Sequence, residues 1–362
     1  MTSTLDTPIV RRKYRATDFV ALLTTPLVPA DYLDLVSPLR SGAPDLRGRI
    51  VAIHPETRDA ATLVIRPGRG WQGHRPGQYV RIGVDIDGVR HWRAYSLTSP
   101  AEMHDRCITI TVKAMPDGLV STHLVRRARV GTLVHLDQAC GDFTLPAPAP
   151  DKVLFVTAGS GITPVMGMLR SGLDDFEDVV VVHSAPTADD VIFARELREL
   201  AARWRIRLVE RHTDADGQLD AAELGRLVPD LAERETWACG PAAMLEALET
   251  YWAERGLADR LHVERFRPSV LVMGEGGTVT FSSSGVEVAG DGATSLLDAG
   301  ESAGVLMPSG CRMGICFGCV APLREGAVRD LRTGEVTIAA PGDGVLVQTC
   351  VSAAAGTCDI AL

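Results

Sequence analysis

Several features that would decide the class of this protein are missing from its sequence. No apolar run approaches the ~20 residues that a membrane-spanning helix needs, and residues 1–20 lack the apolar stretch and cleavage site of a secretory leader. The nine histidines are scattered, without a two-histidine, one-carboxylate or haem-binding pattern. No internal repeat is present. We therefore expect a cytoplasmic monomer without a transmembrane segment, peripheral to a membrane only through a partner, and no self-sufficient oxygenase.

Basic charge is scarce toward the C-terminus. The chain holds 46 Asp and Glu against 37 Lys and Arg, a net charge of −9 that argues against nucleic acid as a partner. Residues 270–362 contain ten acidic residues, four Arg and no Lys, which gives a net charge of −6. An acidic module suits docking to a basic partner surface, and simple solubility explains it equally well.

Length and pattern predict three domains after an N-terminal arm of residues 1–48. Residues 49–147 alternate apolar and polar positions between turns, which predicts an antiparallel β-barrel. Residues 148–268 alternate apolar strands with helices, which predicts a parallel sheet in an α/β domain. Residues 269–362 predict a small α+β domain. The arm contains two expected short helices, "ATDFVALL" and "LVPADYLDLVSPL", and serves either as a packing strap or as a segment that covers a ligand or a partner.

The segment "GCRMGICFGC" concentrates potential metal ligands. Cys311, Cys316 and Cys319 have the spacing C-x4-C-x2-C, and Cys350 follows later in the chain. This is the plant-type spacing of a [2Fe–2S] cluster. Structural zinc is the alternative, although zinc usually uses two closely spaced pairs of ligands.

Three glycines accompany these cysteines: Gly310 precedes Cys311, and Gly314 and Gly318 lie between the later ones. We expect them to let the loop wrap tightly with positive φ, so that backbone N–H groups point at the cluster sulfurs. The segments "PSGCRMGICFGC" and "VQTC" resemble plant-type ferredoxins over residues 275–362. The resemblance implies a β-grasp fold and places Ser309 and Arg312 in the cluster loop.

The segment "RAYSLTS" ends a strand of the predicted barrel. Arg93 could pair with a phosphate, Tyr95 could pack on a ring, and Ser96 could bond a ring heteroatom. Alone, the segment could be an ordinary strand. With "GLVSTHL" downstream it resembles the R-x-Y-S flavin signature of the ferredoxin–NADP reductase superfamily, which implies FAD rather than FMN. The expected second phosphate contact, at a helix N-terminus, comprises Gly118, Val120, Ser121 and Thr122.

A nucleotide site is expected after the first strand of the α/β domain. In "TAGSGITPVMGML" the glycines would let the backbone approach a diphosphate at a helix N-terminus. The segment resembles the "GxGxTP" form of the reductase family, and "ACGPAAML" resembles its nicotinamide-side motif. Cys239 would lie beside the nicotinamide, or is simply a buried strand-end residue. The expected cofactor-binding residues are Gly159, Gly161, Thr163, Pro164, Cys239, Gly240 and Pro241.

The same resemblance extends to "VERF", where Phe266 would cover the flavin and Glu264 would lie close by. Ser184 is expected at the nucleotide ribose, Arg195 and Arg211 could reach a 2′-phosphate, and we favour NADPH over NADH. The catalytic residues that the resemblance implies are Tyr95, Ser96, Cys239 and Glu264.

Together the motifs imply an enzyme that moves electrons from NAD(P)H through FAD and a [2Fe–2S] cluster to an external acceptor. The resemblance extends to actinobacterial-type reductases of membrane fatty-acyl desaturases and alkane hydroxylases, which makes a terminal desaturase or oxygenase the expected partner. The alternatives are the reductase component of a Rieske-type or cytochrome P450 oxygenase, or a non-enzymatic ferredoxin-type carrier.

Overall fold

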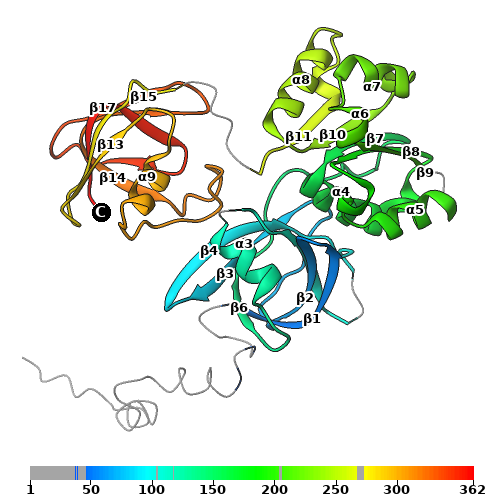
Figure 1. The fold of residues 1–362 in the computed structure, drawn as a ribbon, viewed down its shortest axis with the longest axis horizontal. Coiled ribbons are helices and arrows are strands. Elements are labelled where there is room, and N and C mark those ends of the chain that lie inside the picture. The colour runs from blue at the N-terminus through cyan, green and yellow to red at the C-terminus, as the bar shows by residue number, and fades with distance from the viewer. Residues whose placement is uncertain are drawn as a thin grey trace, which may run out of the picture.

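The computed structural model describes residues 46–102, 105–116, 118–203, 206–266 and 273–362, together with residues 37 and 39 (Figure 1). It contains three sheets, one in each expected domain, so the predicted fold class is confirmed. The two helices expected in the N-terminal arm lie outside the described residues.

The first domain is an antiparallel barrel with strand order β4-β3-β6-β1-β2-β5. A bridge between Leu97 and Ile110 joins its two edge strands. Apolar residues alternate along the strands because one face fills the barrel interior. Its elements are β1 (Arg47–Thr57), β2 (Ala60–Pro67), β3 (Tyr79–Ile86), β4 (Val89–Ser96), β5 (Ile108–Lys113), α3 (Leu119–Arg126) and β6 (Leu133–Leu136).

The second domain is a parallel sheet with strand order β11-β10-β7-β8-β9. Its strands are β7 (Lys152–Ala158), β8 (Asp178–Ala185), β9 (Ile206–His212), β10 (Glu235–Cys239) and β11 (Leu261–Glu264). Its helices are α4 (Ile162–Gly172), α5 (Ala194–Arg203), α6 (Thr213–Asp216), α7 (Ala221–Leu227) and α8 (Ala242–Ala253). Short 3-10 turns are η1 (Gly159–Gly161), η2 (Leu173–Asp175), η3 (Ala188–Asp190), η4 (Leu231–Glu233) and η5 (Ala258–Arg260).

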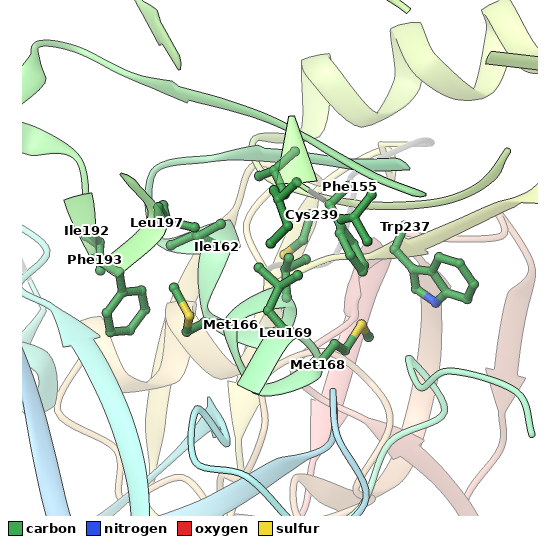
Figure 2. Close-up of a cluster of buried hydrophobic side chains, with 14 of the residues drawn as sticks. Phe155, Ile162, Met166, Met168, Leu169, Ile192, Phe193, Leu197, Trp237 and Cys239 are labelled. Atoms are coloured by element: carbon green, nitrogen blue, oxygen red, sulfur yellow. The ribbon is translucent and has the colours of Figure 1, made fainter. Parts of the chain in front are cut away.

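Apolar cores cover both faces of this parallel sheet, as its continuous hydrophobic strands predict. On one face Phe155 and Trp237 pack with Met166 of α4, as Figure 2 shows. On the other face Trp252 of α8 is fully buried beside residues of α7. The helices therefore fix the sheet from both sides and leave its two edges for polar groups.

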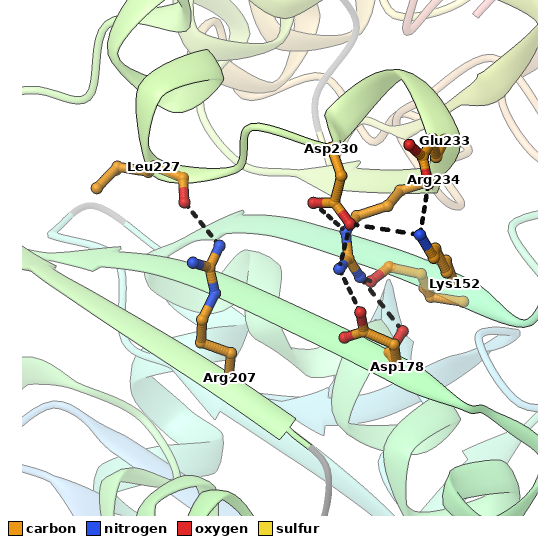
Figure 3. Close-up of polar contacts among 8 residues, drawn as sticks. Lys152, Asp178, Arg207, Leu227, Asp230, Glu233 and Arg234 are labelled. Atoms are coloured by element: carbon orange, nitrogen blue, oxygen red, sulfur yellow. Dashed lines mark hydrogen bonds and ion pairs between the residues drawn. The ribbon is translucent and has the colours of Figure 1, made fainter.

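One of those edges carries an ionic network (Figure 3). The buried Arg234 donates to Asp178 at 2.5 Å and to Asp230 at 2.8 Å, and Lys152 pairs with Glu233 at 2.5 Å. These residues cluster around the N-terminal ends of β7, β8 and β10. A buried arginine needs such partners because unpaired charge in the interior is costly. The network thus stabilises the sheet edge opposite the one that carries the glycine motifs.

The third domain is a mixed sheet with strand order β13-β12-β17-β14-β15, in which β16 also pairs with β14. The hairpin, the helix and the closing strands agree with the sequence expectation, whereas the sequence pattern did not predict β14 and β15. The helix begins after Ser295, whose hydroxyl accepts from the Asp298 N–H as an N-cap. The elements are β12 (Gly277–Phe281), β13 (Val286–Gly290), α9 (Leu296–Ser302), β14 (Val320–Asp330), β15 (Val336–Ala339), β16 (Val345–Gln348) and β17 (Ser352–Ile360).

Candidate functional site

The "RAYS" residues occupy the end of β4, an edge strand of the barrel sheet. Arg93 pairs with Ile82 and Tyr95 pairs with Val80 across the β3–β4 ladder. Directly opposed residues share a face of the sheet, and both β3 partners are fully buried. Arg93 and Tyr95 therefore lie on the inner side of β4, the side against which α3 packs. Ser96 ends the strand and is buried.

The start of α3 is built around Gly118. A Cβ at this position would lie 2.3 Å from Ser121 Oγ, which accepts from the Met115 N–H and donates to the Gly118 carbonyl. Thr122 donates to the Met115 carbonyl at 3.3 Å, and Val120 is buried. The N-cap has no side-chain acceptor, so first-turn N–H groups remain available to an anion.

Arg93 supplies the matching positive charge. Its Nη1 donates to the Trp92 carbonyl at 2.7 Å, and no carboxylate of the described residues forms an ion pair with it. Burial, and after it the positive charge of Arg312, lowers the pKa of the Arg93 guanidinium. A half-buried cation with these surroundings gains stability from a bound anion. The guanidinium and the open end of α3 therefore fit the diphosphate of FAD.

The nucleotide motif forms the turn between β7 and α4. Gly159 adopts φ 53°, a conformation that glycine tolerates best. A Cβ on Gly161 would lie only 2.0 Å from the Cys239 carbonyl oxygen, so the turn contacts the end of β10 directly. Thr163 donates to the Ser160 carbonyl at 2.9 Å, and Pro164 is buried in the first turn of α4. This close packing presents the helix N-terminus at the carboxyl edge of the sheet.

The "ACGP" motif ends the neighbouring strand. Cys239 aligns with Thr157 on one side and with Glu264 on the other, so three strand ends lie side by side. Cys239 is fully buried, and burial raises the pKa of its thiol well above the ordinary value. Burial also raises the pKa of Glu264 to about 7. Gly240 forms a bend after the strand and leads into Pro241, the N-cap of α8.

Ser184 and His183 lie next along this edge. Ser184 aligns with Ala158, and its buried hydroxyl has no hydrogen-bond partner within the described residues. An orphaned hydroxyl beside the glycine turn fits a nucleotide ribose. The sequence analysis missed His183, although a histidine ending the apolar run "VVVVHS" was a usable signal. Its Nδ1 lies 2.8 Å from Thr157 Oγ1, and burial lowers its pKa to about 4.

Three other candidate residues differ from these buried residues in their surroundings. Arg195 is 92% exposed at the start of α5 and lies 3.9 Å from Glu199. The Arg211 guanidinium donates to Glu223 and to carbonyls of the loop after α6, so it stabilises that loop. Phe266 is exposed directly after β11.

Four of the five cysteines of the third domain gather as two pairs, and Cys358 lies in the apolar core. Cys319 Sγ and Cys350 Sγ lie 3.1 Å apart, and the Cys311 N–H donates to Cys316 Sγ at 3.1 Å. Across the described ranges, no three His, Cys, Asp or Glu side chains gather as ligands of a single ion. Two pairs of thiols fit a [2Fe–2S] cluster, in which four cysteines share two irons.

Within this loop the neighbouring thiol and backbone donors favour a thiolate at Cys311 and lower its pKa, whereas the bond to Cys311 raises the pKa of Cys316. The Met313 N–H donates to Cys311 Sγ at 3.3 Å, and the Gly318 N–H donates to Cys316 Sγ at 3.4 Å. A hydrogen bond from Cys316, together with such backbone donors, lowers the pKa of Cys311 to about 5. Cysteine binds metal as the thiolate, so this donor set suits iron.

The expectation for the three loop glycines was partly wrong. Gly314 has φ 73°, but Gly310 and Gly318 do not adopt positive φ. Arg312 (φ 60°) and Phe317 (φ 56°) make the left-handed bends instead.

Three family models match successive parts of the chain. They describe an oxidoreductase FAD-binding domain over residues 50–145, an oxidoreductase NAD-binding domain over residues 155–250, and a 2Fe-2S iron-sulfur cluster binding domain over residues 279–355. An NADPH oxidoreductase of Mycobacterium tuberculosis is 54% identical over 345 residues, covering 93% of this chain and 90% of the relative. The chain belongs to the ferredoxin-reductase-like flavoproteins that carry a C-terminal [2Fe–2S] domain.

Further comparisons place the reductase among multidomain relatives. The ferredoxin reductase component of a 3-ketosteroid-9-alpha-monooxygenase of Mycolicibacterium smegmatis is 31% identical, covering 79% of this chain and 88% of the relative. The solved phthalate dioxygenase reductase shares the fold, with a TM-score of 0.61 at 21% identity over 88% of this chain and 98% of that one. Within the described part of this reductase, no helix is long and apolar enough to cross a bilayer.

The reductase is thus an NAD(P)H-dependent electron-transfer enzyme with FAD and a [2Fe–2S] cluster. FAD supplies the chemistry that converts a two-electron hydride donor into single electrons for the cluster. Arg93, Tyr95, Ser96 and the start of α3 would hold the flavin, and Cys311, Cys316, Cys319 and Cys350 would ligate the irons.

Proposed function

We propose that this reductase takes electrons from NADPH and delivers them to a separate oxygen-activating iron enzyme, an acyl desaturase or an alkane hydroxylase. The observation that carries this proposal is the surface next to the cluster cysteines. Cys319 is 1% exposed, whereas Phe317 is 67% exposed and Ile315 52% exposed. Phe317 keeps this exposure in a left-handed conformation that is unfavourable for a bulky residue.

Exposed apolar side chains beside a redox centre suit a protein partner. Leu306, on the segment that leads into the loop, is 79% exposed and enlarges this apolar surface. The net charge of −6 over residues 270–362 favours a partner with a basic rim. Two relatives are named as reductase components of monooxygenases, one of glycine betaine monooxygenase and one of 3-ketosteroid-9-alpha-monooxygenase, and these names fit delivery of electrons to an oxygen-activating enzyme. Within this proposal the acceptor is the desaturase or hydroxylase, and Rieske-type and P450 oxygenases are the competing acceptors.

The preference for NADPH rests on the ribose side of the nucleotide site. Arg195 exposes its guanidinium at the start of α5, the helix that follows β8 and Ser184. A positive group in this region favours a 2′-phosphate, whereas an acidic residue would favour NADH. The 54% identical relative carries the name NADPH oxidoreductase.

Reconstitution with purified acceptors tests the proposal. Product formation is measured with an acyl desaturase, an alkane hydroxylase, a Rieske-type oxygenase and a P450, each with NADPH and with NADH. We expect product with the desaturase or hydroxylase, and kcat/KM at least about tenfold higher for NADPH, the effect of roughly one lost charged contact. Product with only the Rieske-type oxygenase or the P450 would contradict the proposed acceptor.

A surface variant tests the docking face separately. Phe317→Ser should raise the KM for the acceptor several-fold, because an exposed aromatic contact is lost, and should leave ferricyanide reduction unchanged. Ile338→Ser is the matched control, since Ile338 is 71% exposed on β15 and lies outside the cluster loop. Equal effects of the two variants would refute a specific role for the loop.

A further inference from the structure

Arg81 is held rigidly on the outside of the flavin-binding barrel. It lies on β3 between Val80 and Ile82, whose side chains fill the interior, so its own side chain points outward. Its Nη1 is 3.2 Å from an Asp137 carboxylate oxygen, and its Cζ lies 5.2 Å from the centre of the Trp92 ring. The side chain is only 17% exposed. An ion pair and a cation–π contact thus fix the direction of the guanidinium.

Two glycines of the cluster loop, residues 310–319, face this guanidinium. A Cβ built on Gly310 would lie 3.2 Å from Arg81 Cζ and 2.4 Å from Cys316 Sγ. A Cβ built on Gly318 would lie 3.2 Å from Arg81 Nη2 and 3.3 Å from Cys316 Sγ. Neither glycine has positive φ. Gly310 therefore leaves no room for a side chain beside Cys316, and at Gly318 a side chain would crowd both the guanidinium and the sulfur.

The contact joins two domains. In Figure 1 the C-terminal domain, yellow to red, lies beside the β4 edge of the barrel. The two domains also approach each other at Arg93 of the barrel, because the positive charge of Arg312 in the third domain contributes to lowering the pKa of Arg93. Arg312 itself is tied to its own domain by Asp298 at 2.8 Å and by Glu301. It is Arg81 that reaches the backbone of the cluster loop beside a ligand sulfur.

We propose that Arg81 is a positioning residue that fixes the cluster loop against the flavin-binding barrel and places a positive charge beside Cys316. A [2Fe–2S] cluster held by Cys311, Cys316, Cys319 and Cys350 would gain one negative charge on one-electron reduction. A neighbouring cation stabilises the more negative form, so Arg81 raises the reduction potential of the cluster. The planar guanidinium pairs with Asp137, stacks on Trp92 and lies against the two glycines, an arrangement that an ammonium group does not reproduce. This inference rests on the FAD and cluster sites and is independent of the identity of the acceptor.

Two substitutions in the full-length holoenzyme separate the two effects. Arg81→Gln removes both the positive charge and the planar guanidinium group, whereas Arg81→Lys keeps only the charge. Arg90→Gln is the matched control, because Arg90 forms an ion pair with Asp85 on the same strand pair. Hydrogen–deuterium exchange of peptides spanning residues 79–86 and 310–319 reports docking. The cluster midpoint potential, from an EPR-monitored dithionite titration without nucleotide, reports the local charge.

In Arg81→Gln we expect faster exchange in both peptides, by roughly tenfold for the loss of a charge-assisted contact, and a lower midpoint potential. Arg81→Lys should also show faster exchange but a potential near that of the wild type. Arg90→Gln should match the wild type in both measurements. NADPH-driven ferricyanide reduction should persist throughout, and its loss would indicate a failure of the reductase function itself.

Unchanged exchange and potential in Arg81→Gln, with full FAD and cluster content, would overturn the proposal. Equal changes in Arg90→Gln would also overturn it, because they would show a general response of the barrel. If Arg81→Gln does not retain its cofactors, Arg81→Lys decides: exchange at the wild-type rate in that variant contradicts the positioning role.

Discussion

Replacing Glu264 with Gln should change how the stability of the nucleotide-binding domain depends on pH. Burial raises the pKa of Glu264 from 4.5 to about 7. Between these values the folded domain keeps the proton, whereas the unfolded chain releases it. Stability contributed by this group is therefore present at low pH and is lost as the pH rises through about 7.

The size of the effect follows from the shift. Each pKa unit corresponds to about 1.4 kcal/mol. If the carboxyl were fully shielded from solvent, the unfolding free energy of the domain would therefore fall by about 3 kcal/mol over this interval. Glu264 is partly exposed, and solvent screening reduces the expected loss to about 2 kcal/mol. Gln has nearly the same shape and does not titrate. Glu264→Gln should therefore be the more stable protein at about pH 8 and should lose this advantage at about pH 5.

Calorimetry of the FAD-saturated full chain measures this difference. The transition of the nucleotide-binding domain is the one that added NADP⁺ shifts to higher temperature. At about pH 8 its midpoint should lie roughly 5–10 °C higher in Glu264→Gln than in the wild type. Glu246→Gln is the matched control, because Glu246 is exposed on α8 of the same domain.

Two results would refute this reasoning. Parallel pH dependences of wild type and Glu264→Gln would show that the carboxyl is not buried in the folded protein. A similar change in Glu246→Gln would show that any lost negative charge has this effect.

Two further substitutions test the cofactor sites. Arg93→Ala should raise the Kd for FAD roughly ten- to a hundredfold, because a charge-assisted phosphate contact is lost; retention of stoichiometric FAD through extensive dialysis would contradict the assignment. Cys316→Ser should remove the cluster EPR signal and one-electron output while sparing NADPH-driven ferricyanide reduction, and loss of both activities in folded, FAD-replete protein would contradict this division of roles.

The sequence predicts the three domains well because the spacing of apolar residues changes from one domain to the next. Strands alternate in the barrel, whereas β7 and β8 are apolar throughout since helices cover both faces of their sheet. The sequence also indicates the candidate cysteine ligands, because three of them lie in one short loop. The weak point is β14, whose sequence "VAPLREGAVRD" contains a proline and a glycine that usually interrupt strands.

Residues that act through distant partners could not be predicted in this way. Arg81 is an ordinary strand residue until the cluster loop is placed against it. The glycines at 310 and 318 suggested backbone freedom, and only the structure shows that they make room for a neighbouring domain. Arg211 looked available for a phosphate, but a turn that follows it in the chain uses its donors. Each of these roles depends on tertiary proximity, which local periodicity does not encode.

The close approach at Gly310 and Gly318 also limits how this architecture can be re-engineered. The third domain has its own sheet and core, so its exchange for another electron-carrying module is an obvious design. A graft with alanine or a larger residue at either glycine would meet Arg81 and Cys316 at 3.3 Å or less. A successful chimera would therefore have to match the small residues of the incoming loop to the barrel strand, and not only the cysteine spacing.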